Sequence, residues 1–137
     1  MGNKFIFDVD GTLTPSRRGM DGEFQGYFLD FCYANDVYLV TGSDYAKTLE
    51  QVGPDVCNAV TRIYNCNGND VWEKGVNVRT NDWTLPEDAH EWLSVQLTES
   101  TYRTRTGLHF EHRPGLVNFS IVGRNATQSE RKLYRRL

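Results

Sequence analysis

Apolar and polar residues along the first half of the chain predict an alternation of strands and helices. Short, nearly continuous apolar runs, typical of buried strands, occupy residues 4–8, 37–40 and 60–66. Between the first and second runs, residues 18–35 repeat aromatic side chains at helical spacing. Between the second and third runs, residues 45–52 form a shorter amphipathic segment. The order strand, helix, strand, helix, strand predicts an α/β fold built on a parallel sheet.

The second half of the chain follows a different pattern. A helix is expected over residues 84–97, an antiparallel hairpin over 107–122 and a final helix over 127–137. Both helices begin with Thr-x-x-Glu, which is typical of a capping box. We therefore predict two parts, an α/β core at residues 1–75 and an α+β domain at residues 76–137.

Composition and charge add one feature to this picture. The 137 residues are 39% apolar and 12% aromatic, which is enough to build a core and argues against disorder. No apolar run reaches the roughly 18 residues of a membrane-spanning helix. Residues 1–100 carry 7 basic and 16 acidic side chains, whereas residues 101–137 carry 8 basic and 2 acidic ones. The Arg-rich tail could attract nucleic acid, acidic lipid or a phosphorylated small molecule, and charge alone leaves all three open.

The cysteines indicate a cellular location. Cys32, Cys57 and Cys66 form no Cys-x-x-Cys pair, and their odd number fits buried thiols better than a disulfide framework. The first residues also lack the apolar segment of a secretion signal. A reducing, cytoplasmic location is therefore expected.

The clearest candidate for chemistry follows the first predicted strand, at residues 8–14 (DVDGTLT). Asp8 would lie at the carboxyl end of the strand, where open α/β sheets bind their ligands. Asp10 lies two residues on, and Gly11 permits a tight turn that brings both carboxylates together. One carboxylate can accept a phosphoryl group while the other donates and recovers a proton. Because two carboxylates and a phosphate repel one another, we expect Mg²⁺ held by Asp8 and Asp10.

These residues resemble the first motif, DxDGT, of the haloacid dehalogenase (HAD) superfamily. The resemblance implies that Asp8 is the nucleophile and Asp10 the general acid and base. The second motif of the superfamily is a Thr or Ser that ends the next core strand, and Thr41 and Ser43 match it. The resemblance implies that these hydroxyls bind the transferring phosphate. An ordinary turn that caps a helix is the alternative interpretation of residues 41–44.

Longer segments are similar to one family within this superfamily, the phosphomannomutases of the eukaryotic type. The similar segments are residues 7–17 (FDVDGTLTPSR), 42–53 (GSDYAKTLEQVG), 67–68 (NG), 110–125 (FEHRPGLVNFSIVGRN) and 128–131 (QSER). Residues 69–106 show little similarity. The hairpin segment is far more specific than DxDGT, because other HAD caps lack it.

The family resemblance implies a HAD-like Rossmannoid parallel-sheet core with an inserted α+β cap of type C2B, both of them partial. By matched position it implies that Arg17 of the core and Arg113, Arg124 and Arg131 of the cap bind phosphates, with Asn118 near the sugar. The planar guanidinium fork suits bidentate binding of phosphate. The implied reaction interconverts mannose 6-phosphate and mannose 1-phosphate, with hexose 1,6-bisphosphate as activator. A homodimer formed through the cap is also implied.

Other functions stay open at the level of sequence. The family's Lys motif and its last acidic motif lie after the cap, and we expect this chain to end within the cap. A HAD sugar-phosphate phosphatase, in which water attacks the aspartyl-phosphate, and a truncated, non-catalytic sugar-phosphate-binding fragment are the alternatives. The expected partner in each case is a phosphorylated hexose. Neither nucleic acid nor a membrane is expected, because the basic residues lie in the matched cap without aromatic stacking platforms.

Overall fold

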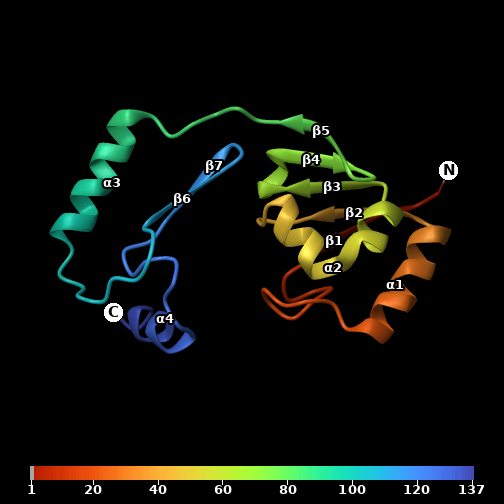
Figure 1. The fold of residues 1–137 in the computed structure, drawn as a ribbon, viewed down its shortest axis with the longest axis horizontal. Coiled ribbons are helices and arrows are strands. Elements are labelled where there is room, and N and C mark those ends of the chain that lie inside the picture. Colours follow the sequence, from red (N-terminus) through yellow and green to blue (C-terminus); the bar gives the residue numbers. More distant parts are fainter. Residues whose placement is uncertain (1) are drawn as a thin grey trace. The chain divides into compact units, whose positions relative to one another are not determined.

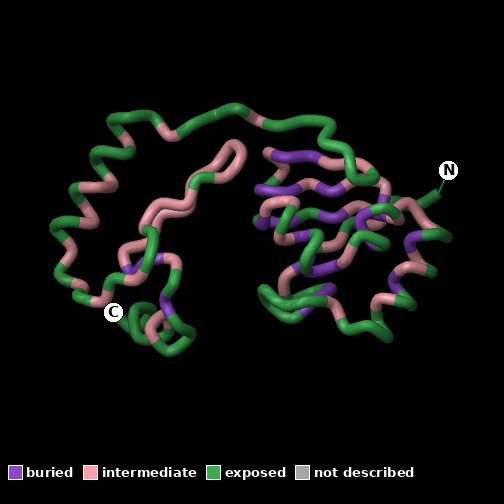
Figure 2. The backbone as a smooth tube through the Cα atoms, viewed as in Figure 1, coloured by how far each residue is buried: buried purple, intermediate pink, exposed green. Residues whose placement is uncertain are grey.

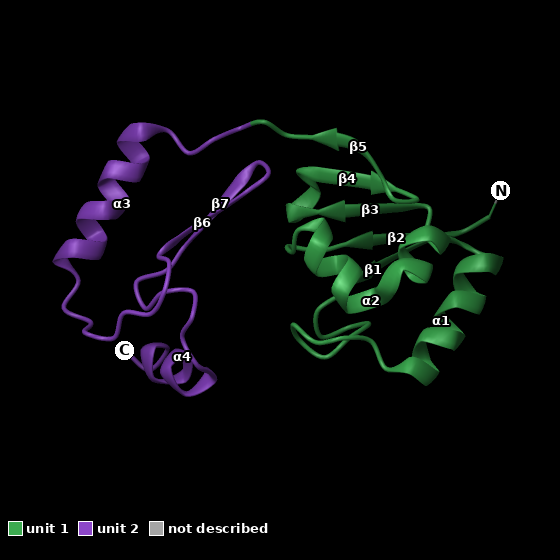
Figure 3. Ribbon diagram, viewed as in Figure 1, with its two compact units in different colours: residues 1–82 green, residues 83–137 purple. Residues whose placement is uncertain are grey.

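The computed structural model describes residues 2–137. The chain forms two compact units, Met1–Asp82 and Trp83–Leu137 (Figure 3). The division lies later than the predicted boundary between residues 75 and 76. The reason is that residues 76–80 form a strand that pairs with the sheet of the first unit.

The first unit is an α/β sheet layer with two helices (Figure 1). Its elements are β1 (Lys4–Asp8), α1 (Gly22–Ala34), β2 (Asp36–Val40), α2 (Tyr45–Ala59), β3 (Arg62–Asn65), η1 (Cys66–Gly68), β4 (Asp70–Glu73) and β5 (Val76–Thr80). The strand order is β1-β2-β3-β4-β5, with β1, β2 and β3 parallel and β4 and β5 antiparallel. The predicted α/β fold with a parallel sheet is therefore confirmed.

Both helices of this unit pack on one face of the sheet. Crossovers between neighbouring parallel strands are almost always right-handed, so the order β1-β2-β3 places α1 and α2 on the same side. The buried core combines apolar residues of both helices with those of the central strands, among them Phe28, Val52, Val56, Leu39 and Ile63. Figure 2 shows these buried segments on the strands and helices of the unit.

The opposite face of the sheet differs from the prediction. Fully buried strands were expected from the apolar runs, but Ile6 is 69% exposed and Val40 is 38% exposed. Phe5 and Phe7, on the other side of β1, pack against the helices. An apolar run shows that a segment is a strand, but both faces of the strand carry apolar side chains and the run does not reveal which face is covered.

An aspartate caps the N-terminus of each α-helix of this unit, and a glycine interrupts α2. The Asp21 carboxylate accepts a hydrogen bond from Phe24 N (3.1 Å), and Asp44 accepts one from Lys47 N (2.9 Å). The helix expected to stop at Gly53 instead kinks there, with φ at 82°, and continues to Ala59. The following Pro54 suits the first turn of the resumed helix, where its missing N–H costs nothing.

The second unit contains α3 (Glu87–Glu99), the hairpin β6 (Phe110–Arg113) and β7 (Leu116–Phe119), and α4 (Gln128–Tyr134). The hairpin pairs Phe110 with Phe119 and Arg113 with Leu116, which confirms the antiparallel prediction. At α4 the capping box is present: Glu130 N donates to Thr127 Oγ1 (3.2 Å) and Thr127 N donates to Glu130 Oε2 (2.7 Å).

The prediction of a capping box at α3, the first helix of this unit, is wrong. Pro86 is the N-cap of α3, and no side chain there accepts a capping hydrogen bond.

Within residues 2–137, no helix has the length and the apolar content that a bilayer crossing would require.

We predict that Gly123→Ala destabilises the second unit by about 2 kcal/mol or more. Gly123 has φ at 90°, and an added Cβ would meet the carbonyl group of Thr106, whose carbon would lie only 2.6 Å away. Urea unfolding measures the effect.

The matched control is Gly26→Ala in the exposed part of α1, where a Cβ meets nothing within 4 Å. This change is expected to stabilise the chain by up to about 1 kcal/mol, the helix preference of Ala over Gly. Equal effects of the two substitutions would contradict the steric account of Gly123.

Candidate active site

The two aspartates predicted to be catalytic lie at the carboxyl end of β1. Asp8 is the last residue of the strand, and Gly11 takes φ at 74° in the turn that follows. Gly11 N donates to Thr14 O (2.8 Å), which closes the turn tightly. Asp8 is exposed and accepts a long hydrogen bond from Thr12 Oγ1 (3.5 Å). The turn therefore presents one carboxylate to solvent close to the end of the strand.

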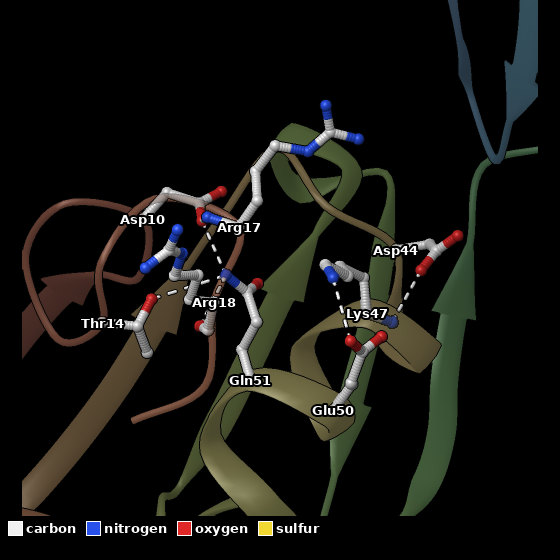
Figure 4. A network of polar contacts seen from close by, with 8 residues as sticks. All are labelled: Asp10, Thr14, Arg17, Arg18, Asp44, Lys47, Glu50 and Gln51. Carbon is white, nitrogen blue, oxygen red and sulfur yellow. Dashed lines mark hydrogen bonds and ion pairs between the residues drawn. The ribbon is translucent and has the colours of Figure 1, made fainter. Parts of the chain in front are cut away.

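Asp10 is held more firmly than Asp8 (Figure 4). Its Oδ1 accepts hydrogen bonds from the main-chain N–H of Arg17 (2.7 Å) and from Gln51 Nε2 (2.6 Å). Gln51 lies in α2 and is only 2% exposed. Gln51 is absent from the predicted site residues. Its one sequence signal is its place in the segment 42–53, which matched the resembling family.

Arg17 contributes through its backbone in this structure. Its φ of 61° is unusual for a residue with a side chain, and this conformation directs its N–H to Asp10. The guanidinium group extends away from Asp10 in Figure 4. The predicted role of that group, binding phosphate, stays a prediction.

Thr41 and Ser43 follow β2 beside the same end of β1. In the parallel register Asp8 pairs with Val40, so Thr41 comes one residue beyond Asp8's partner. Both residues are buried, and Ser43 N donates to Thr41 Oγ1 (3.1 Å). The loop is also tied to the segment after β3, because Cys66 N donates to Ser43 O (2.9 Å). The structure thus brings both predicted phosphate-binding residues to the strand ends, and phosphate binding itself stays a prediction.

The cysteines are structural. All three are buried and outside disulfides, as expected. Burial raises the pKa of Cys32 and of Cys57 to about 11, so both thiols stay protonated and unreactive at neutral pH.

In the second unit, Glu111 ties two of the predicted arginines together. Arg113 Nη2 lies 3.1 Å from Glu111 Oε1, and Arg124 Nε lies 2.5 Å from Glu111 Oε2. Asn118 is opposite Glu111 across the hairpin, so the two side chains share a face. Arg131 donates to Arg124 O (3.0 Å) and to Ala126 O (3.0 Å). The hairpin and α4 thereby gather the predicted residues of this unit into one basic cluster.

The electrostatic environment of Glu111 follows from these contacts. Partial burial by itself raises the pKa of Glu111, but the hydrogen bond and charge of Arg113, together with Arg124, outweigh it. The resulting pKa lies below its ordinary value, so the carboxylate stays ionised at neutral pH.

We predict a pH-dependent cost of Glu111→Gln. The pKa of Glu111 is lower in the folded than in the unfolded chain, so its stabilisation is complete above the ordinary value of 4.5 and is lost as pH falls through the lowered value. Urea unfolding should show the variant to be less stable than the wild type at pH 7, and the difference should shrink as the pH falls below 4.5.

Glu91→Gln, at an exposed position of α3, is the charge-matched control. It should lower stability less than Glu111→Gln at pH 7. A difference between wild type and Glu111→Gln that stays unchanged over the whole acid titration below pH 4.5 would contradict the ion-pair account.

The donor set near Asp8 suits Mg²⁺ better than a metal held only by protein ligands. Within residues 2–137 there is no group of three or more His, Cys, Asp or Glu side chains that could hold a metal ion. Mg²⁺ commonly takes one or two protein oxygens and completes its shell with water and substrate phosphate. Asp8 is exposed and fits this role, whereas Oδ1 of Asp10 is already occupied by two donors.

Fold and site together define a HAD-like α/β protein, and comparison with known proteins narrows the class. The sequence profile described as "Eukaryotic phosphomannomutase" matches residues 32–137. A phosphomannomutase of Saccharomyces cerevisiae is 33% identical over 96% of this chain and 54% of its own length. One of Spinacia oleracea is 31% identical over 92% of this chain and 53% of its own length. The chain belongs to the eukaryotic phosphomannomutase family.

The relatives are considerably longer, since the chain spans about half the length of the curated relatives it matches. The fold is also similar to a solved structure from Eubacterium rectale. That similarity has a TM-score of 0.50 at 14% identity and covers 70% of this chain and 36% of the other.

Proposed function

We propose that the chain carries phosphoryl-transfer residues of a phosphomannomutase, which interconverts mannose 6-phosphate and mannose 1-phosphate. The observation that supports this most directly is the turn at the end of β1, where Asp8 is exposed and Asp10 is fixed by two donors. Family membership supports the same reaction class.

In the proposed reaction, Asp8 attacks the phosphorus of the activating hexose 1,6-bisphosphate. The bond from phosphorus to the sugar oxygen breaks, and that oxygen takes a proton from Asp10. The products are an aspartyl-phosphate and a hexose monophosphate. In the reverse step Asp10 removes a proton from a sugar hydroxyl, whose oxygen attacks the aspartyl-phosphate and regenerates Asp8.

The remaining predicted residues would bind the substrate's anionic groups. Thr41 and Ser43 would hydrogen-bond the transferring phosphate, and Arg17 would add positive charge. The basic cluster of Arg113, Arg124 and Arg131, together with Asn118, would hold a phosphate and the sugar in the second unit. We further propose that a second copy of the chain binds through this unit.

Mg²⁺, when bound, would neutralise charge between the carboxylates and the phosphate. Asp8, through its exposed carboxylate, and Asp10 would hold it.

A second candidate is a fragment that binds sugar phosphates without turnover. The observation in its favour is that the chain spans only about half the length of its curated relatives. Its binding residues would be the same as those above.

We predict that Asp8→Asn lowers the rate of the wild-type chain at least about 1,000-fold, since it removes the nucleophile. The assay supplies mannose 1-phosphate with a catalytic amount of hexose 1,6-bisphosphate and Mg²⁺. Phosphorus NMR detects the conversion. Asp30→Asn, at an exposed position of α1, should leave the rate unchanged. Release of inorganic phosphate without isomerisation would identify a phosphatase, and sugar-phosphate binding without any turnover would identify the binding fragment.

We also predict that Arg124→Lys weakens the binding of mannose 1-phosphate about tenfold, because Lys loses the planar fork while keeping the charge. Calorimetry measures the dissociation constant. Arg103→Lys, at an exposed position of the same unit, makes the identical chemical change outside the basic cluster and should have no effect. An equal effect of both substitutions would contradict a specific role of Arg124.

A further inference from the structure

The amide of Gln51 is a buried polar group whose shortest hydrogen bond is to one oxygen of Asp10. We propose that Gln51 is a positioning residue that determines which oxygen of Asp10 meets the substrate. This inference rests on the proposed function, in which Asp10 gives and takes the proton. Gln51 itself touches no reacting atom in this scheme.

Two N–H donors occupy the same oxygen of Asp10. Gln51 Nε2 lies 2.6 Å from Oδ1, and the main-chain nitrogen of Arg17 lies 2.7 Å from it. Both distances lie at the short end of the range for N–H···O hydrogen bonds, so both donors contact this oxygen closely. An oxygen that accepts two such bonds would have to give one up to face a sugar hydroxyl. Oδ2 is therefore the oxygen that takes the proton from the attacking hydroxyl and returns it to the leaving oxygen.

The surroundings of Gln51 fix the orientation of its amide (Figure 4). Nε2 also lies 3.4 Å from Thr14 Oγ1 and 3.4 Å from Arg18 O, so three acceptors surround the nitrogen. The main-chain oxygen of Gln51 accepts a hydrogen bond from Met20 N (2.7 Å). One residue of α2 thus ties the loop that follows Asp10 at several points, and an amide flip would place Oε1, which cannot donate, against all three acceptors.

The backbone of Arg17 supports the same interpretation. Its left-handed φ of 61° costs free energy for a residue with a side chain, and such strain persists where surrounding contacts enforce it. In this conformation the N–H of Arg17 reaches the oxygen that Gln51 also binds. The loop and α2 therefore act together on a single carboxylate.

A positioning role and a merely structural role predict different kinetics. Release of p-nitrophenolate from p-nitrophenyl phosphate needs little protonation, whereas release of a sugar alkoxide depends on a general acid. A misplaced Asp10 therefore slows the transfer from a hexose phosphate and leaves the transfer from p-nitrophenyl phosphate nearly unchanged. General weakening of the fold slows both.

The experiment compares Gln51→Met with the wild type on both esters in a single turnover, in which Asp8 takes the phosphoryl group and the alcohol leaves, using the full chain with Mg²⁺. We expect about a tenfold loss with the hexose phosphate, a part of the 100-fold or more that general acid catalysis contributes, and less than about a twofold loss with p-nitrophenyl phosphate. Equal losses on both esters, or no loss on either, would overturn the inference.

Gln25→Met is the matched control. Gln25 Nε2 also donates a tertiary hydrogen bond in the same unit, to Val52 O (2.7 Å), but away from Asp10. It should leave the ratio of the two rates unchanged. Gln51→Leu also removes the donor and adds no charge next to Asp10, so it should reproduce the kinetic pattern even where Gln51→Met folds poorly.

A readout without turnover separates this inference from the proposed function. The carbon NMR signal of the Asp10 carboxyl group should shift in Gln51→Met and stay in place in Gln25→Met. A wild-type chain that turns over neither ester would contradict the proposed function. The carboxyl signal would then still test the contact between Gln51 and Asp10 by itself. An unchanged signal in Gln51→Met would overturn the inference whatever the activity.

Discussion

The parallel pairing of β1 with β2 is the constraint on which the candidate site depends. Because Asp8 lies opposite Val40, the residues that follow these two strands leave the sheet at the same edge. The pairing of Val40 with Tyr64 extends that edge to β3. The loop after β3 then fixes the loop after β2, since Cys66 N donates to Ser43 O. Groups that are far apart in sequence are held near one another by backbone hydrogen bonds, before any side chain contributes.

The apolar core adds a second level of control over the site. Val52 and Val56 of α2 are completely buried against residues such as Leu39 of β2, so the helix has little freedom to move on the sheet. Gln51 lies on that helix and reaches Asp10 from it. The position of one carboxylate oxygen thus depends on hydrophobic packing of the helix as well as on the turn that contains the carboxylate. The amide of Gln51, which is only 2% exposed, thus acts on a turn in which Asp8 is exposed while Val9 and Thr14 are buried.

Local patterns predicted much of the fold, and long-range contacts account for what they missed. The turn after Asp8 was predictable because Gly11 tolerates a positive φ, and the α4 cap because Thr127 and Glu130 have the right spacing. The exposure of Ile6 was missed because it depends on which face the helices cover. The contact of Gln51 with Asp10 joins residues 41 positions apart and has no local signal.

The uneven charge along the chain has a physical consequence for the phosphate binding that we propose for the second unit. Two guanidinium groups held close together repel each other, and Glu111 relieves that repulsion by pairing with Arg113 and Arg124 at once. The pairing uses Nη2 of one arginine and Nε of the other, and an arginine carries five N–H donors. Glu111 therefore fixes the positions of both arginines relative to each other. The three side chains together still carry a net positive charge. In the proposed binding, a phosphate would meet donors that are already ordered, so less side-chain entropy would be lost.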